Sequence, residues 1–139
     1  MRLLTFRKHG ELTTRIGAVS ERGEVIDIGL AFASYLKGKG DPSATGSAQA
    51  CIPMDMVEFI NGGQAVLESA ETANAHVEKK RSKGGVLGIN SEKLYMSQSE
   101  IEFLPPILRP YKMISAAMNY REYLADSGRT APEIPVAFL

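Results

Sequence analysis

The chain has 139 residues, and its 16 basic and 16 acidic side chains give a formal net charge of zero at pH 7. This length suits one ordinary domain, or a small domain followed by the start of another. The densest basic run, residues 79–83, is expected at a helix C-terminus, where it complements the helix dipole. Nucleic-acid binding needs a broader basic face and is therefore disfavoured.

The N-terminus lacks the apolar stretch of a signal peptide, and no segment has the length of a transmembrane helix. Cys51 is the single cysteine of the chain, so an internal disulfide is excluded. The cysteine count favours a reducing, cytoplasmic setting.

Residues 2–28 predict a three-stranded antiparallel meander. Its strands are expected at residues 3–6, 13–19 and 25–28, with turns between them that contain glycine. Such short strands need a helix over one face of the sheet.

Three segments after the meander carry helix and loop signals. Residues 30–36 predict a short helix that glycines stop. Residues 41–50 are small and polar and predict a mobile loop. Pro53 suits the first turn of a second helix, residues 54–60, because it lacks the amide that would be unpaired there.

The longest helix is expected over residues 64–81, ending at the glycine-rich residues 84–88. Apolar side chains at helical spacing predict its buried face. They are Val66, Ala70, Ala73 and Val77.

The chain changes character near Tyr95, where it becomes extended and rich in proline, and a domain boundary is expected there. Residues 113–118 form a continuous apolar run that predicts a strand buried on both faces. Asn119 is expected to cap the following helix and Gly128 to end it. The apolar residues 134–139 are typical of a strand cut from its sheet.

Glu100 and Glu102 lie two residues apart and would share one face of a strand, where they could hold a divalent cation. The favoured alternative is a solvated strand edge, which charged side chains commonly protect. His9, His76 and Cys51 lack partners at the spacing that metal ligation or nucleophilic catalysis requires.

The helix after Asn119 places Tyr120, Tyr123 and Leu124 on one face, and Tyr123 with Asp126 is an i, i+3 pair. Two interpretations stay open. The tyrosines pack while Asp126 is solvated, or a phenol and a carboxylate act together at the mouth of the strand.

Several segments together resemble the fumarylacetoacetate hydrolase family. Pro110, Lys112, Ile114, Asn119 and Tyr120 match a segment in which Pro-x-Lys-Ile-Ile leads through a strand to Asn-Tyr. Four earlier segments are also similar in order and spacing. They are Arg-Ile-Gly-Ala-Val (residues 15–19), Val-Ile-Asp-Ile-Gly (25–29), Pro-x-Asp-Met (53–56) and Leu-Pro-Pro-Ile (104–107).

The resemblance implies an α+β fold. Residues 1–95 would form a small N-terminal domain with a meander and helices, and residues 96–139 a linker and the truncated beginning of a mostly-β catalytic domain. It also implies a cytoplasmic, dimeric enzyme that uses magnesium or manganese on acylpyruvates or related 2-oxo acids. The cation would chelate the substrate and stabilise an enolate during carbon–carbon hydrolysis, decarboxylation, isomerisation or dehydration.

The resemblance assigns catalytic positions to Tyr123 and Asp126, where the family has His and Glu, and substrate binding to Asn119, Tyr120 and Arg121. A phenol, with a pKa of about 10, is a poor base but can donate to an oxyanion. Isomerase- or dehydratase-like chemistry is therefore favoured over hydrolysis.

No Glu-x-Glu pair follows Asn119, so no metal ligands are predicted within the chain. The chain is expected to be the N-terminal portion of such an enzyme and to be inactive alone. The alternative is a non-catalytic interaction module that pairs through residues 134–139.

Overall fold

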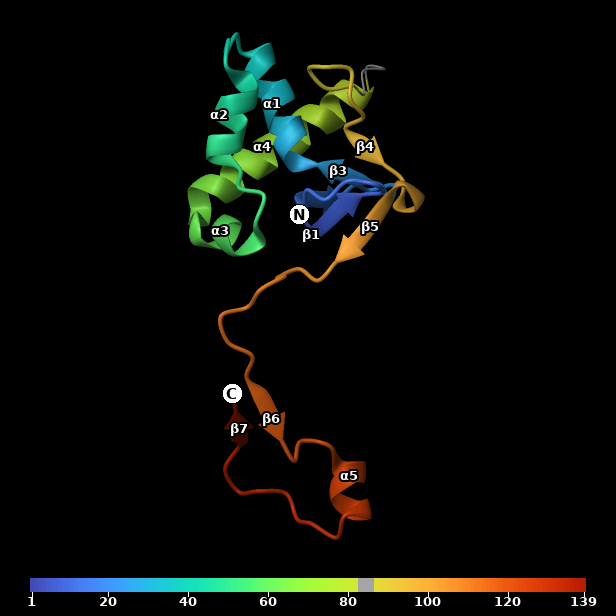
Figure 1. Ribbon diagram of the computed structural model, residues 1–139, viewed down its shortest axis with the longest axis vertical. Helices are drawn as coiled ribbons and strands as arrows, with labels where there is room; N and C mark the ends of the chain where they lie inside the picture. Colours follow the sequence, from blue (N-terminus) through green and yellow to red (C-terminus); the bar gives the residue numbers. More distant parts are fainter. Residues whose placement is uncertain (83–86) are drawn as a thin grey trace. The chain divides into compact units, whose positions relative to one another are not determined.

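The computed structural model describes residues 1–82 and 87–139. These residues form two compact units, Met1–Leu108 and Arg109–Leu139 (Figure 1). Within the described ranges, no helix combines the length and apolar character needed to cross a membrane. The units are mixed in α and β structure, as the sequence predicts.

A five-stranded antiparallel sheet organises the first unit, with the strand order β4-β3-β2-β1-β5. The meander is confirmed as its three central strands. The strands are β1 (Leu3–Lys8), β2 (Arg15–Val19), β3 (Val25–Asp27), β4 (Tyr95–Met96) and β5 (Ile101–Leu104). The expected domain boundary after residue 95 stays a prediction; β5, beyond that boundary, pairs with β1 in the first unit.

Four helices accompany the sheet and pack against one of its faces (Figure 1). They are α1 (Ile28–Gly38), α2 (Ala44–Cys51), α3 (Met56–Asn61) and α4 (Gly63–Ser82). Ile26 of β3 faces the main core with these helices, whereas its neighbour Val25 faces a smaller cluster around Phe6. This alternation follows from the period of two in a strand.

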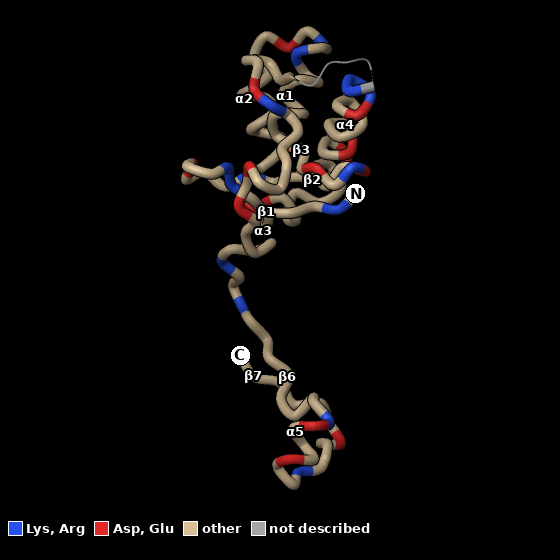
Figure 2. Tube along the Cα trace, turned by 90° about the vertical axis from the view of Figure 1, so that its right-hand side faces the viewer, with Lys and Arg blue, Asp and Glu red and all other residues tan. Residues whose placement is uncertain are grey.

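The long predicted helix is confirmed as α4. Ala70, Ala73 and Val77 are fully buried in the main core, and Val66 packs at its edge. Basic residues occupy the last turn of α4, as the composition of the run predicts, and form the blue segment at its end (Figure 2). The predicted glycine stop falls largely on residues 83–86, outside the described residues.

The loop predicted over residues 41–50 is wrong, because most of this segment is helix α2. Ala44 and Ala48 lie one helical turn apart and are buried. Their small side chains allow α2 to approach the core closely, so tertiary packing outweighs a weak local preference.

The start of the next helix also differs from the prediction. Pro53 lies outside α3, whose N-cap is Asp55. The Asp55 carboxylate accepts hydrogen bonds from the backbone N–H groups of Val57 (2.8 Å) and Glu58 (3.1 Å). A side-chain cap satisfies two orphan donors, which a proline at N1 cannot do.

The second unit contains the paired strands β6 (Ser115–Ala117) and β7 (Val136–Phe138) and the helix α5 (Arg121–Asp126). The expectation that residues 113–118 are buried on both faces is wrong, since Met113 and Ile114 are each 72% exposed. Within this unit β6 pairs with β7 alone and no layer covers its faces.

Of the two predictions for the ends of α5, one is wrong and one is confirmed. The Asn119 cap is wrong, because Tyr120 occupies the N-cap position and its side chain makes no capping hydrogen bond. The Gly128 stop is confirmed: this residue has φ +65°, and its N–H donates to the carbonyl of Ala125. The N–H of Arg129 donates to the carbonyl of Leu124, which completes a Schellman motif.

Gly17→Ala is expected to lower the free energy of unfolding by about 1–3 kcal/mol, because buried cores do not tolerate added volume. An added Cβ would lie 2.6 Å from Cγ1 of Val25 and 3.0 Å from Cε1 of Phe6. Urea unfolding followed by circular dichroism measures the change. The control is Gly46→Ala in α2, where an added Cβ meets nothing within 4 Å. Equal stability of the two variants would contradict this packing argument.

Candidate functional site

The second unit contains a shallow hollow of about 350 Å³ beside β6, β7 and the start of α5. Asn119 and Arg121 line this hollow, together with the buried Leu124, which anchors α5. Met118 also lines it and has a left-handed φ of +52°, which is uncommon for a residue other than glycine. Two of the predicted site residues, Asn119 and Arg121, therefore lie on one concave surface together with the strained backbone of Met118.

The other three predicted site residues lie apart from the lining of the hollow. Tyr120 and Tyr123 are 69% and 52% exposed, and Asp126 is also exposed. The hydroxyl of Ser127 donates to the backbone carbonyl of Tyr123 at 2.7 Å, so it holds the main chain rather than the phenol. The catalytic and binding roles of these residues stay predictions.

Glu100 and Glu102 do not form a cation site with each other. Glu100 lies in the short 3₁₀ helix Gln98–Glu100, accepts hydrogen bonds from Ser97 and forms an ion pair with Lys93. The Lys93 hydrogen bond, aided by Ser97, lowers the pKa of Glu100 to about 2. Glu102 accepts two hydrogen bonds from Arg7 across β1 and β5, at 2.7 and 2.9 Å, and these lower its pKa.

A metal ion does not fit the part of the chain that the structure describes. In residues 1–82 and 87–139, no group of three or more His, Cys, Asp or Glu side chains could hold one. Glu100 and Glu102, the most suggestive carboxylates in the sequence, each already pair with a basic side chain. No catalytic step through a metal is therefore derived from these residues.

Neither the two histidines nor the cysteine joins a group of potential metal ligands among the described residues. His76 packs edge-on against Tyr35, with ring centroids 5.6 Å apart. Burial, followed by the charge of Lys80, lowers the pKa of His76. The backbone N–H of His9 donates to the carbonyl of Glu100, and Cys51 is an exposed free thiol.

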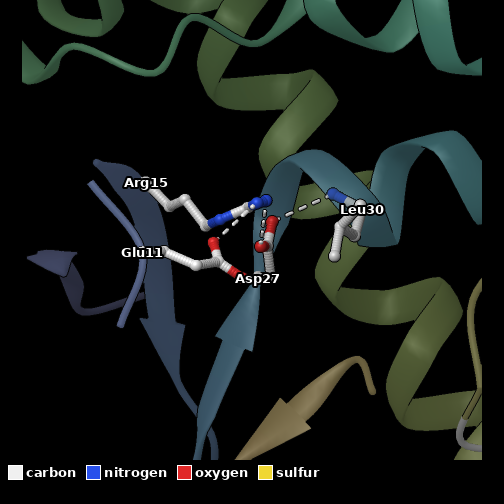
Figure 3. Close-up of polar contacts among 4 residues, drawn as sticks. All are labelled: Glu11, Arg15, Asp27 and Leu30. Carbon is white, nitrogen blue, oxygen red and sulfur yellow. Dashed lines mark hydrogen bonds and ion pairs between the residues drawn. The ribbon is translucent and has the colours of Figure 1, made fainter. Parts of the chain in front are cut away.

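Sequence reasoning missed a buried polar cluster where β3 meets α1 (Figure 3). Asp27 is 2% exposed and is the N-cap of α1: its Oδ1 accepts from the N–H of Leu30 at 3.0 Å. Its Oδ2 accepts from Nη1 of Arg15 at 3.1 Å, and Nη2 of Arg15 donates to Glu11 at 3.2 Å. The sequence signal that could have identified Asp27 as a helix cap is its position directly before a helical apolar pattern.

Burial dominates the electrostatics of this cluster and raises the pKa of the Asp27 carboxyl group. The hydrogen bond from Leu30 and then the charge of Arg15 oppose the increase. The cluster therefore combines a costly buried acid with the contacts that make its burial tolerable.

A cavity of about 190 Å³ adjoins this cluster. Arg15 and Asp27 line it together with Gly29 and Leu30 at the start of α1. Thr45 and Gln49 of α2 also line it. The other lining residues are apolar and include Ile16, Ala33, Ala48, Ile52 and Met54.

No protein-family model matches the chain. Over 139 residues, 99% of the chain, it is 27% identical to "Oxaloacetate tautomerase fahd2, mitochondrial" of Xenopus laevis. It is 28% identical over 87 residues to the Bos taurus "Oxaloacetate tautomerase FAHD2A, mitochondrial", and 26% identical over 87 residues to the Homo sapiens protein of that name. Each mammalian match covers 63% of this chain.

These similarities confirm the resemblance to the fumarylacetoacetate hydrolase family as distant homology. The chain spans 34% of the length of the Xenopus relative, and the aligned parts make up 23% of each mammalian one. It is related to oxaloacetate tautomerases and corresponds to one part of those enzymes.

The titration of Asp27 predicts a specific dependence of stability on pH. An acid whose pKa is raised by folding binds its proton more tightly in the folded state. Its contribution is thus fully present below the ordinary pKa of 3.8 and is lost as the pH rises through the raised value. As the pH rises through this interval, the unfolding free energy of the wild type should therefore fall relative to that of Asp27→Asn.

Urea unfolding at a series of pH values from 3 to 7 measures this difference. Glu100→Gln is the control with the opposite sign. Because the pKa of Glu100 falls from 4.5 to about 2, its contribution is present above 4.5 and is lost as the pH falls through about 2. A wild-type advantage over Asp27→Asn that grows with pH would contradict the effect of burial.

Proposed function

We propose that the chain supplies the N-terminal part of a tautomerase or isomerase of 2-oxo acids in the fumarylacetoacetate hydrolase family. The observation that carries this proposal is the similarity of nearly the whole chain to an oxaloacetate tautomerase. Under this proposal, the second unit is the beginning of a mostly-β catalytic domain, and oxaloacetate or a related acid is the substrate.

The residue at position 123 supports tautomerisation over hydrolysis. Tautomerisation moves one proton between the enol oxygen and the carbon next to the one that bears this oxygen, and it consumes no water, so it needs no base to activate water. Tyr123 stands where the resemblance implies histidine, and a phenol at neutral pH is a hydrogen-bond donor. Its exposed side chain is available to donate to a developing enolate oxygen.

Charge and concavity support a binding role for the start of α5. The side chain of Arg121 brings a permanent positive charge to the hollow, where it would pair with a substrate carboxylate. Asn119, in the same lining, offers an amide for a carbonyl or carboxylate oxygen. Tyr120 and Asp126 would complete the site from the exposed part of this region.

The magnesium or manganese ion that the resemblance implies would be held by carboxylates outside the described residues, because these contain no suitable group. The isolated chain should therefore be inactive. Carbon–carbon hydrolysis, decarboxylation and dehydration are the other reactions that the resemblance implies.

The proposal also includes a homodimer and a location in the cytoplasm, a reducing compartment. The relatives named above are mitochondrial.

The decisive experiment reads the genomic sequence downstream of codon 139 and assays the product of the complete reading frame. The proposal expects an in-frame Glu-x-Glu pair and an aspartate, and conversion of enol to keto oxaloacetate that stops when the metal is chelated. The 139-residue chain alone should not accelerate this conversion. Magnesium-dependent turnover by the isolated chain would overturn the assignment of the ligands to another part of the protein.

Replacement of Tyr123 by Phe in the complete protein should lower kcat for enol-to-keto conversion by about 100-fold, because one transition-state hydrogen bond is lost. Loss of ultraviolet absorbance by the enol measures the rate. Tyr111→Phe is the matched control, since Tyr111 lies in the same unit and is 90% exposed. Equal rates in both variants would remove Tyr123 from the reaction.

A second candidate function is a non-catalytic module that forms a homodimer through β7. The observation that favours it is a run of exposed apolar side chains at this strand. Ile134, Val136, Phe138 and Leu139 are 43–81% exposed. A strand edge with such side chains can add to a strand of another copy.

Light scattering of the isolated 139-residue chain after size exclusion tests this second candidate. A defined dimer that Phe138→Lys converts to monomer would support the module, because a charge at a paired apolar strand opposes association. Arg129→Lys, at an exposed position of the same unit, is the control. Concentration-dependent aggregation without a defined species would contradict the module.

A further inference from the structure

The cavity beside Asp27 joins an apolar wall to a buried ion pair within the first unit. Its walls come from β2, the end of β3, α1, α2 and the segment before α3. Its volume of about 190 Å³ lies below the roughly 300–1,000 Å³ of pockets for drug-sized ligands. An occupant must therefore be a molecule of only a few non-hydrogen atoms.

The polar end of the cavity contains both donors and acceptors with unused capacity. Arg15 has five N–H groups, and its recorded hydrogen bonds go from Nη1 to Asp27 and from Nη2 to Glu11. Its Nε is buried without a hydrogen-bond partner among the described residues. Each oxygen of the Asp27 carboxylate has one recorded bond and can accept another.

The charges at this end disfavour an ionic occupant. A carboxylate ligand would face the buried Asp27, with Glu11 on the other side of the guanidinium (Figure 3). An ammonium ligand would face the charge of Arg15. An uncharged head that both donates and accepts matches the side-by-side guanidinium and carboxylate, and a primary amide has this arrangement.

We propose that this cavity binds a small aliphatic carboxamide. Its carbonyl oxygen would accept from the Arg15 guanidinium, and its N–H group would donate to the Asp27 carboxylate. The aliphatic part would contact the apolar side chains around Ile16, Ala48 and Ile52. The site lies in the first unit and is independent of the 2-oxo acid chemistry proposed for the second.

Gly29 provides a sharp test, because it lines the cavity next to Asp27. A Cβ added there would lie 3.6 Å from Oδ1 of Asp27, which is an ordinary contact. Gly29→Ala should therefore fold normally, and its helix propensity should keep or raise the melting temperature. The new methyl group would occupy space in front of the carboxylate that the amide head needs.

The experiment titrates the 139-residue chain with butyramide and follows the backbone amide of Leu30 and the methyl groups of Ala48 and Ile52 by NMR. We expect saturable shifts with a Kd of about 1–10 mM, as a ligand of roughly six non-hydrogen atoms allows. Butyrate has the same shape but lacks the donor, and it should bind about tenfold more weakly.

Two variants decide the location. Gly29→Ala should weaken butyramide binding about tenfold or more. Gly46→Ala adds the same methyl group to an exposed helical position outside the cavity and should bind like the wild type. Non-saturating shifts, or equal binding by Gly29→Ala, would overturn the site. Equal affinity for butyrate and butyramide would overturn the assignment of an amide head.

Discussion

The first unit depends on one buried carboxylate. Asp27 ends β3, caps α1 and pairs with Arg15 of β2, so a single side chain fixes the turn from sheet to helix. The direction in which α1 leaves the sheet follows from this turn. Because burial of a charge is costly without partners, the cap and the ion pair must form together. The main core then packs between the sheet and the helices that follow α1.

The cavity beside Asp27 is bordered by small side chains of α1 and α2. Gly29 and Ala33 are small residues about one turn apart on α1, and they line the cavity together with the small Ala48 of α2. Small side chains allow close helix packing, and their small volume also leaves space beside Arg15. A polar cluster in the lining of such a space provides specificity that an apolar void lacks.

The sequence predicts an element correctly where a local pattern of residues is enough to determine that element. The turns of the meander and the apolar stripe of α4 are of this kind, and both predictions are confirmed. Helix α2 could not be predicted because Ala44 and Ala48 carry little apolar signal until α1 lies against them. The Asp27–Arg15 pair was equally hidden, since the two residues meet only when β2 pairs with β3. Glu100 and Glu102 do not share a cation, in keeping with the favoured interpretation of a solvated edge, because Glu100 pairs with the nearby Lys93 and Glu102 pairs with Arg7 on β1.

The two units divide the chemistry between buried and exposed groups. Five acidic side chains in the described part of the first unit lie in ion pairs, and a carboxylate so paired is a poor ligand for a cation. They are Glu11, Glu24, Asp27, Glu100 and Glu102. In the second unit, Tyr123 and Asp126 are exposed, and Arg121 lines an open hollow. A substrate anion would find an accessible positive charge and a phenolic donor there. The first unit therefore suits a supporting role and a small uncharged ligand, and the second suits contact with a 2-oxo acid.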